Sequence, residues 1–115
     1  MTTRLLLVDD HASFRAVARE VMERAGFEVV GEAGDGASAV KTAEALRPDA
    51  VLLDVGLPDE DGFAVCERLA GRGIPVVLMS SRHAHDYADR LAGTPARGFV
   101  PKSALTGEAV RELLR

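Results

Sequence analysis

Short runs of apolar residues alternate along this chain with longer amphipathic stretches. Residues 5–8, 50–53 and 76–79 are apolar at every position, and residues 28–30 and 98–100 form weaker runs of the same kind. A run that is apolar at every position, rather than at alternate ones, is typical of a strand that is covered on both faces, as in a parallel sheet. The pattern therefore predicts five strands in such a sheet.

The stretches between these runs carry apolar residues at helical spacing. They predict helices over residues 14–25, 39–46, 63–70, 87–92 and 110–114. Gly26, Pro48 and Gly71 follow the first three and are typical helix stops. Strands that alternate with helices in this way predict an α/β fold, a doubly wound parallel sheet with helices on both faces.

Composition narrows the classes of partner. The 115 residues are 47% hydrophobic and 28% charged, which fits one globular domain over residues 1–115. A net charge of −4 argues against direct binding of nucleic acid, because duplex binding needs a basic face. We expect no membrane contact, since no apolar run approaches the length of a bilayer span. The single cysteine, Cys66, fits a reducing compartment, so we expect a cytoplasmic location.

Polar residues follow four of the predicted strands. Asp9 and Asp10 follow the first, Asp54 the third and Ser80 the fourth, while Lys102 lies just beyond the fifth. In open α/β sheets, ligands bind outside the carboxyl ends of the strands. We therefore expect these five residues at one edge of the sheet.

Each of these residues alone also has an ordinary structural interpretation, such as a helix cap or a solvated strand end. Together they indicate a functional site that binds ions. Three carboxylates at one edge would repel each other without a cation, and oxygen ligands favour a hard ion such as Mg²⁺. A lysine and a serine hydroxyl can both bind an anionic group. The set suits a phosphoryl group, with a carboxylate to accept it covalently.

Five motifs carry a resemblance to a known family. They are Val8-Asp9-Asp10-His11, Leu53-Asp54-Val55-Gly56-Leu57-Pro58, Asp61-Gly62, Leu78-Met79-Ser80-Ser81 and Gly98-Phe99-Val100-Pro101-Lys102. In order and spacing the chain resembles, over essentially its whole length, the receiver domain of bacterial two-component response regulators. The residues around 9–15 and 99–105 are also similar to receivers of the subfamily that often carries a helix-turn-helix output domain. The resemblance implies a CheY-like, flavodoxin-like sheet of five parallel strands in the order 2-1-3-4-5, with five helices.

The resemblance also implies roles for individual residues. Asp54 matches the phosphoacceptor, and Lys102 matches the lysine that contacts the phosphoryl oxygens. Asp9 and Asp10 match the acidic pair that holds Mg²⁺, with Asp10 as the direct ligand and Asp9 acting through water. The carbonyl of Gly56 matches the backbone ligand of the metal. The implied donor is a sensor histidine kinase or a phosphotransfer protein, and the domain would catalyse its own phosphorylation and dephosphorylation rather than act as an enzyme on other substrates.

The implied output is a conformational switch. Ser80 matches the switch hydroxyl and Phe99 the aromatic switch residue. The readout face would be the fourth helix, fifth strand and fifth helix, roughly residues 84–115, through which the domain could also form a homodimer. Gly56 and Arg82 depart from the commoner pattern, and our hypothesis is that they set the lifetime of the phosphorylated form.

Two other interpretations stay open at this stage. Residues 34–39 read G-x-G-x-x-A, a weak dinucleotide-binding signal, whose ordinary alternative is a tight turn into a helix. The chain could also be a receiver-like module that binds proteins without being phosphorylated. Only thirteen residues follow Lys102, so we expect no output domain within the chain. The sequence does not decide between a stand-alone receiver and a piece of a DNA-binding regulator.

Overall fold

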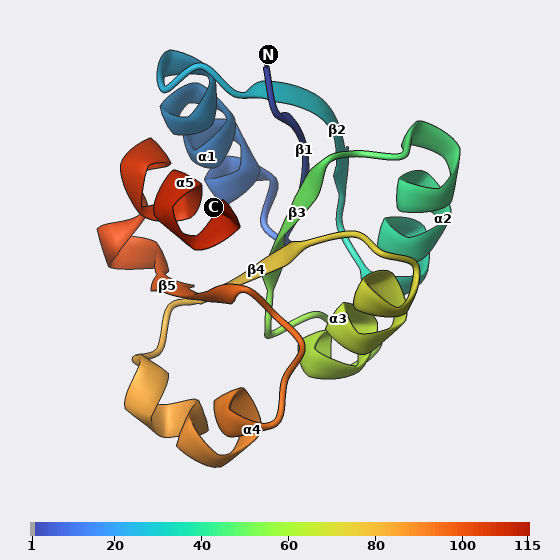
Figure 1. Cartoon of the computed structure of the whole chain (residues 1–115), viewed down its shortest axis with the longest axis vertical. Coiled ribbons are helices and arrows are strands. Elements are labelled where there is room, and N and C mark those ends of the chain that lie inside the picture. The colour runs from blue at the N-terminus through green and yellow to red at the C-terminus, as the bar shows by residue number, and fades with distance from the viewer. Residues whose placement is uncertain (1) are drawn as a thin grey trace.

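The computed structural model describes residues 2–115 and contains one parallel sheet. Its strands are β1 (Arg4–Val8), β2 (Glu28–Ala33), β3 (Ala50–Asp54), β4 (Val76–Ser80) and β5 (Gly98–Pro101). They lie in the order β2-β1-β3-β4-β5, and every neighbouring pair is parallel (Figure 1). The predicted fold class and strand order are therefore confirmed.

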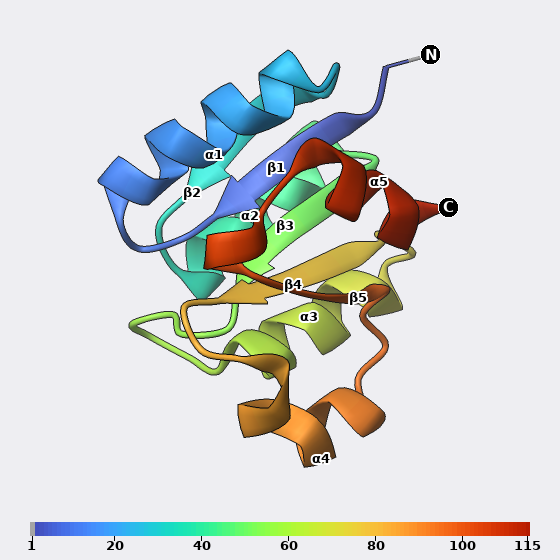
Figure 2. The ribbon, with the colours of Figure 1, turned by 90° about the vertical axis from the view of Figure 1, so that its left-hand side faces the viewer.

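Five α-helices surround the sheet in the described residues. They are α1 (Ala12–Arg24), α2 (Gly36–Leu46), α3 (Gly62–Gly71), α4 (Ala88–Ala92) and α5 (Gly107–Leu114), with short 3₁₀ turns η1 (Ala84–Tyr87) and η2 (Lys102–Ala104). Helices α1 and α5 cover one face, and α2 and α3 cover the other (Figure 2). No helix within residues 2–115 has the length and apolar character needed to cross a membrane.

The central strands are buried on both faces. Leu5 and Leu7 of β1 pack on the side of α1 and α5, whereas Leu6 and Val8 pack on the side of α2 and α3. Every residue of β3 and β4 is buried as well. Burial on both faces is the physical reason for the uninterrupted apolar runs in these segments. The edge strands β2 and β5 are only partly buried, which explains why their runs are weaker.

Local side-chain bonds fix where the helices begin. The Asp35 carboxylate accepts a hydrogen bond from Ser38 N at the start of α2, and the Asp61 carboxylate accepts one from Phe63 N at the start of α3. Such caps satisfy backbone N–H groups that have no partner within the helix. They anchor the two loops that leave the carboxyl ends of β2 and β3, beside the predicted site.

Candidate functional site

A lysine connects two buried carboxylates at the carboxyl edge of the sheet. Lys102 Nζ lies 3.2 Å from Asp54 Oδ2 and 2.5 Å from Asp9 Oδ2. Asp54 ends β3, Asp9 follows β1, and Lys102 follows β5. Segments 48 residues apart in sequence thus meet through their side chains because the parallel sheet brings their strand ends to one edge.

Burial dominates the electrostatics of Asp54. Only 5% of the residue is exposed, and Asp9 beside the same ammonium is fully buried. Burial raises the pKa of the Asp54 carboxyl, and the negative charge of Asp9 raises it further. The Gly56 N–H, which donates to Asp54 Oδ1 at 3.0 Å, and the Lys102 ammonium oppose that rise without cancelling it. Cations that approach Asp54 therefore gain more than they would at an exposed carboxylate.

The Lys102 ammonium is held in its charged form. Burial alone would lower its pKa, but the Asp9 and Asp54 carboxylates together raise the pKa of Lys102 above its ordinary value. The ammonium also lies 4.5 Å from the centre of the Phe14 ring, a cation–π contact from helix α1. These contacts fix a point charge directly beside Asp54.

Asp10 and His11 extend the acidic cluster toward solvent. Ligand atoms of Asp9, Asp10 and His11 lie within 4.8 Å of one another. His11 N donates to Asp9 Oδ1 at 2.7 Å, and His11 Nδ1 lies 2.9 Å from Asp10 Oδ1. Asp10 is exposed, whereas Asp9 is buried.

The charge balance of this edge fits a divalent cation. The Asp9 and Asp54 carboxylates share the Lys102 ammonium, and the Asp10 carboxylate lies beside Asp9, so three carboxylates gather around one lysine. Carboxylate oxygens are the ligands that Mg²⁺ prefers, and it usually takes one or two of them together with water. The donor set is therefore suited to Mg²⁺.

Ser80 lies at the same edge, and Phe99 lies within the neighbouring strand β5. Ser80 ends β4 and is 4% exposed. Its hydroxyl accepts a hydrogen bond from Arg82 N at 3.0 Å and lies 3.0 Å from the Tyr87 hydroxyl. The Phe99 ring lies 5.9 Å from the Tyr87 ring, centre to centre. Within residues 2–115, no hydrogen bond joins Ser80 to Asp54 or Lys102.

Two residues near the site carry contacts that the sequence analysis did not anticipate. The sequence pattern accounts for Tyr87 only as the first residue of the predicted helix 87–92, whereas its hydroxyl lies 3.0 Å from the Ser80 hydroxyl. Asp59, in the loop after β3, accepts hydrogen bonds from Gly36 N and Ala37 N at 2.8 and 3.1 Å. The sequence marks Tyr87 only as the single tyrosine of the chain, which does not indicate a contact with Ser80.

Asp59 bears on the dinucleotide interpretation of residues 34–39. The N–H groups of Gly36 and Ala37, which would face a pyrophosphate in such a site, already donate to the Asp59 carboxylate. Ser38 N donates to Asp35 in the same turn. The backbone N–H groups of this turn therefore already donate to carboxylates of the chain itself. This argues against binding of an anionic cofactor there.

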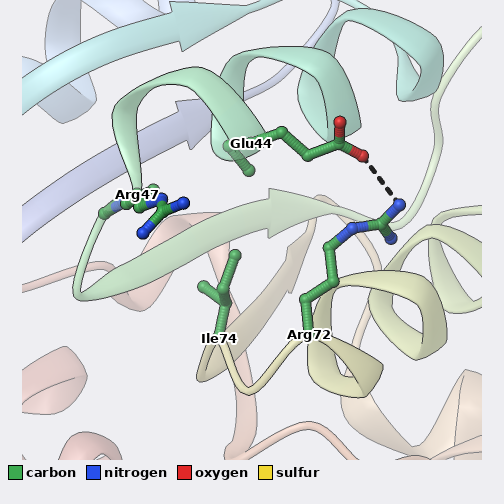
Figure 3. A pocket seen from close by; sticks show the side chains of 6 residues that line it. Glu44, Arg47, Arg72 and Ile74 are labelled. Carbon is green, nitrogen blue, oxygen red and sulfur yellow. Dashed lines mark ion pairs between the residues drawn. The ribbon is translucent and has the colours of Figure 1, made fainter.

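A hollow in the surface lies away from this site. A cavity of about 580 Å³ is bordered by Glu44 and Arg47 near the end of α2 and by Arg72 and Ile74 after α3 (Figure 3). Glu44 and Arg72 form an ion pair across it at 2.7 Å. Because it lies beside the segments that lead into β3 and β4, it is at the opposite edge of the sheet from Asp54. It has no part in the candidate site.

Comparison with known families gives a match over nearly the whole chain. The family model described as the response regulator receiver domain matches residues 5–114. BvgA of Bordetella pertussis, named as a virulence-factor transcription regulator, is 38% identical over 104 residues, which cover 89% of this chain and 50% of that protein. The DNA-binding transcriptional activator EvgA of Escherichia coli K12 is 35% identical over 100 residues, 84% of this chain and 48% of that protein. The chain thus spans about half the length of these curated relatives.

A solved structure shows the same arrangement. The LuxR-family two-component response regulator from Aurantimonas sp. SI85-9A1 superimposes with a TM-score of 0.90 at 28% identity. The match covers 99% of this chain and 86% of that one. Sequence and fold comparisons therefore point to the same family.

Proposed function

This chain belongs to the response regulator receiver domain family, and on that premise we propose that it accepts a phosphoryl group on Asp54 from a phosphohistidine of a sensor histidine kinase or phosphotransfer protein. The observation that carries the proposal is the contact of the Lys102 ammonium with both Asp54 and Asp9. It supplies a buried nucleophile beside a fixed positive charge. That pairing is what a transferring phosphoryl group requires.

Asp9, Asp10 and Asp54, with the backbone carbonyl of Gly56, would hold Mg²⁺ in this proposal. When bound, Mg²⁺ supplies positive charge that neutralises phosphoryl oxygens. Asp10 is the exposed member of the set and is therefore open to an ion arriving from solvent. Asp9 is buried against Lys102, so its role is also to hold that ammonium in place.

The proposed transfer is a direct displacement at phosphorus. A carboxylate oxygen of Asp54 forms the new P–O bond while the P–N bond to the donor histidine breaks, and its electron pair returns to the imidazole. Lys102 pairs with the phosphoryl oxygens as charge spreads over them. Hydrolysis reverses the modification: a water oxygen bonds to phosphorus, the P–O bond to Asp54 breaks, and inorganic phosphate leaves.

Phosphorylated Asp54 carries roughly 1.5 to 2 negative charges in place of the single charge of its carboxylate, beside the carboxylates of Asp9 and Asp10. In the proposed switch, Ser80 turns its hydroxyl toward the new oxygens, and Phe99 moves into the space that this vacates. The change is read out on α4, β5 and α5, through a partner protein or a homodimer. Since BvgA and EvgA are named as regulators of transcription, the output we propose is transcriptional, through a DNA-binding region other than this domain.

A phosphorylation assay tests this function. We expect acetyl phosphate with Mg²⁺ to add one phosphoryl group to the protein, detected by intact mass, and Asp54→Asn to abolish the adduct. Glu67→Gln removes one exposed carboxylate of α3 and is the matched control, which should be modified like the wild type. A wild-type protein that takes no phosphoryl group would contradict the proposal and favour a module that binds proteins without phosphorylation.

A further inference from the structure

The Ser80 hydroxyl is already engaged in this structure. It accepts a hydrogen bond from Arg82 N and lies 3.0 Å from the Tyr87 hydroxyl. Ser80 is buried and Tyr87 is partly buried, so water competes poorly for the bond between them. Both contacts of the hydroxyl come from the segment that leads from β4 into α4.

Tyr87 is held firmly in position for this contact. It ends η1 and directly precedes α4. Its ring lies between Phe63 of α3 and Phe99 of β5, with ring centres 5.7 and 5.9 Å away. Phe99 itself has no hydroxyl, so within this aromatic cluster only Tyr87 can bond to Ser80.

A serine hydroxyl has one proton and two acceptor positions. Arg82 N–H takes one acceptor position. If Ser80 donates its proton to Tyr87, it has none left for a phosphoryl oxygen. If Tyr87 is the donor, the Ser80 proton stays free, but both acceptor positions are held by groups from the segment that leads into α4. In both cases a turn of the hydroxyl toward Asp54 breaks the hydrogen bond to Tyr87.

We propose that Tyr87 is a positioning residue of the switch, whose hydroxyl holds Ser80 in the unphosphorylated arrangement and links Ser80 directly to the start of α4. The inference rests on the proposed phosphorylation of Asp54. When Ser80 turns to the phosphoryl group, the Tyr87 hydroxyl loses its partner. The start of α4 is thereby released, while the ring keeps its contact with Phe63.

The kinetic test is the variant Tyr87→Phe, which removes the hydroxyl and keeps the ring. Loss of one neutral hydrogen bond corresponds to roughly a three- to tenfold change in an equilibrium. We expect Tyr87→Phe to be phosphorylated by acetyl phosphate about that much faster than the wild type. In a Ser80→Ala background, the same substitution should leave the rate unchanged, whereas a purely structural role of Tyr87 would alter the rate in both backgrounds.

A spectroscopic readout follows the same bond. The chain has one tyrosine and no tryptophan, so its tyrosine emission comes from Tyr87 alone. We expect this emission to change when wild-type protein is phosphorylated and to stay constant in Asp54→Asn under the same conditions. An adduct that forms without an emission change, or a Tyr87→Phe rate equal to or below that of the wild type, overturns this inference alone. A wild-type protein that forms no adduct overturns the proposed function as well.

Discussion

Asp54 shows how one residue combines two opposed requirements. The proposed transfer requires an ionised Asp54, yet burial raises the pKa of this carboxyl. Lys102 and the Gly56 N–H partly restore the ionised form without removing the carboxylate from its buried position. The residual cost of negative charge in this place is what an arriving cation relieves.

The lifetime of a phosphoryl group on Asp54 is predicted to depend on the residue two positions later. A Cβ atom at Gly56 would lie 3.9 Å from Asp54 Oδ1, an ordinary contact, so the position accepts a side chain. We expect Gly56→Asn to slow dephosphorylation several-fold by covering the acyl phosphate. We expect Arg82→Ala to speed it, since Arg82 lies next to Ser80 at the open side of the site.

Rates of phosphate release from the purified phosphoprotein measure both effects. Gly71→Asn is the matched control, because a Cβ atom at Gly71 meets nothing within 4 Å and the residue lies at the end of α3. Unchanged rates in both Gly56→Asn and Arg82→Ala would show that neither residue sets the lifetime.

At the level of elements, helix α3 approaches β3 more closely than a side chain allows. A Cβ atom on Gly62 would lie 2.6 Å from Asp54 O and 2.6 Å from Val55 Cα. Gly62 N donates to Val55 O at 3.0 Å, which ties the start of α3 to the end of β3. The glycine therefore fixes the backbone that carries Asp54.

Substitution of Gly62 is predicted to disturb both stability and the site. Since backbone atoms cannot yield as a flexible side chain does, we expect Gly62→Ala to cost about 1–3 kcal/mol of unfolding free energy. We also expect slower phosphorylation of Asp54. Denaturant titration and the acetyl phosphate assay measure the two effects. Gly71→Ala in the same helix has open space and should leave both nearly unchanged; equal behaviour of the two variants would refute the close approach.

Helix α1 and strand β2 are joined by a pH-sensitive ion pair cluster. The Glu32 carboxylate accepts hydrogen bonds from Arg15 and Arg19 at 2.9 and 2.8 Å. Burial would raise the pKa of Glu32, but the two guanidinium groups outweigh burial and hold that pKa below its usual value. A lowered pKa in the folded state stabilises the protein above the ordinary carboxyl range, and this contribution is lost as pH falls through the folded-state pKa.

The variant Glu32→Gln is therefore predicted to be less stable than the wild type at neutral pH. Because the pairs are partly exposed, the difference should be roughly 0.5–1 kcal/mol. It should shrink as the pH falls below about 4, where the wild-type carboxyl becomes protonated. Urea unfolding across this pH range measures it, and a difference that does not vary with pH would contradict the assignment.

The elements also show how far the sequence could predict the structure. Apolar runs identified β1, β3 and β4 without ambiguity, because both faces of these strands are buried. The weaker runs of β2 and β5 reflect their edge positions, and the short α4 has no buried residue to mark it. The irregular pairing of β1 with β2 between Leu5 and Leu6 left no pattern in the sequence.

In the whole molecule, the parallel topology explains why the candidate site was predictable at all. Residues that follow parallel strands must arrive at one edge, so Asp9, Asp54 and Lys102 could be grouped from sequence alone. The contact of Tyr87 with Ser80 could not be, because it depends on the path of the chain from β4 to α4. The same holds for Asp59, whose bonds to the start of α2 depend on the fold of a loop.

Mg²⁺ should stabilise the whole molecule if the acidic edge binds it. Binding at a hundred times the dissociation constant adds about 2.7 kcal/mol to the free energy of unfolding. We expect Mg²⁺ to raise the melting temperature of the wild type relative to EDTA, and Asp10→Asn to lose most of this shift. Glu67→Gln removes one negative charge away from the acidic edge and should keep the Mg²⁺-dependent rise in melting temperature. Equal rises in Asp10→Asn and the wild type would show that the ion binds elsewhere.

The most direct measurement locates the phosphoryl group and tests its dependence on the ion. The protein is treated with acetyl phosphate in Mg²⁺ or in EDTA, and the modified residue is identified by mass spectrometry of its peptides. The account predicts one phosphoryl group on Asp54 that forms with Mg²⁺ and is nearly absent in EDTA. Modification of a different residue, or equal modification of Asp54 without the ion, would contradict it.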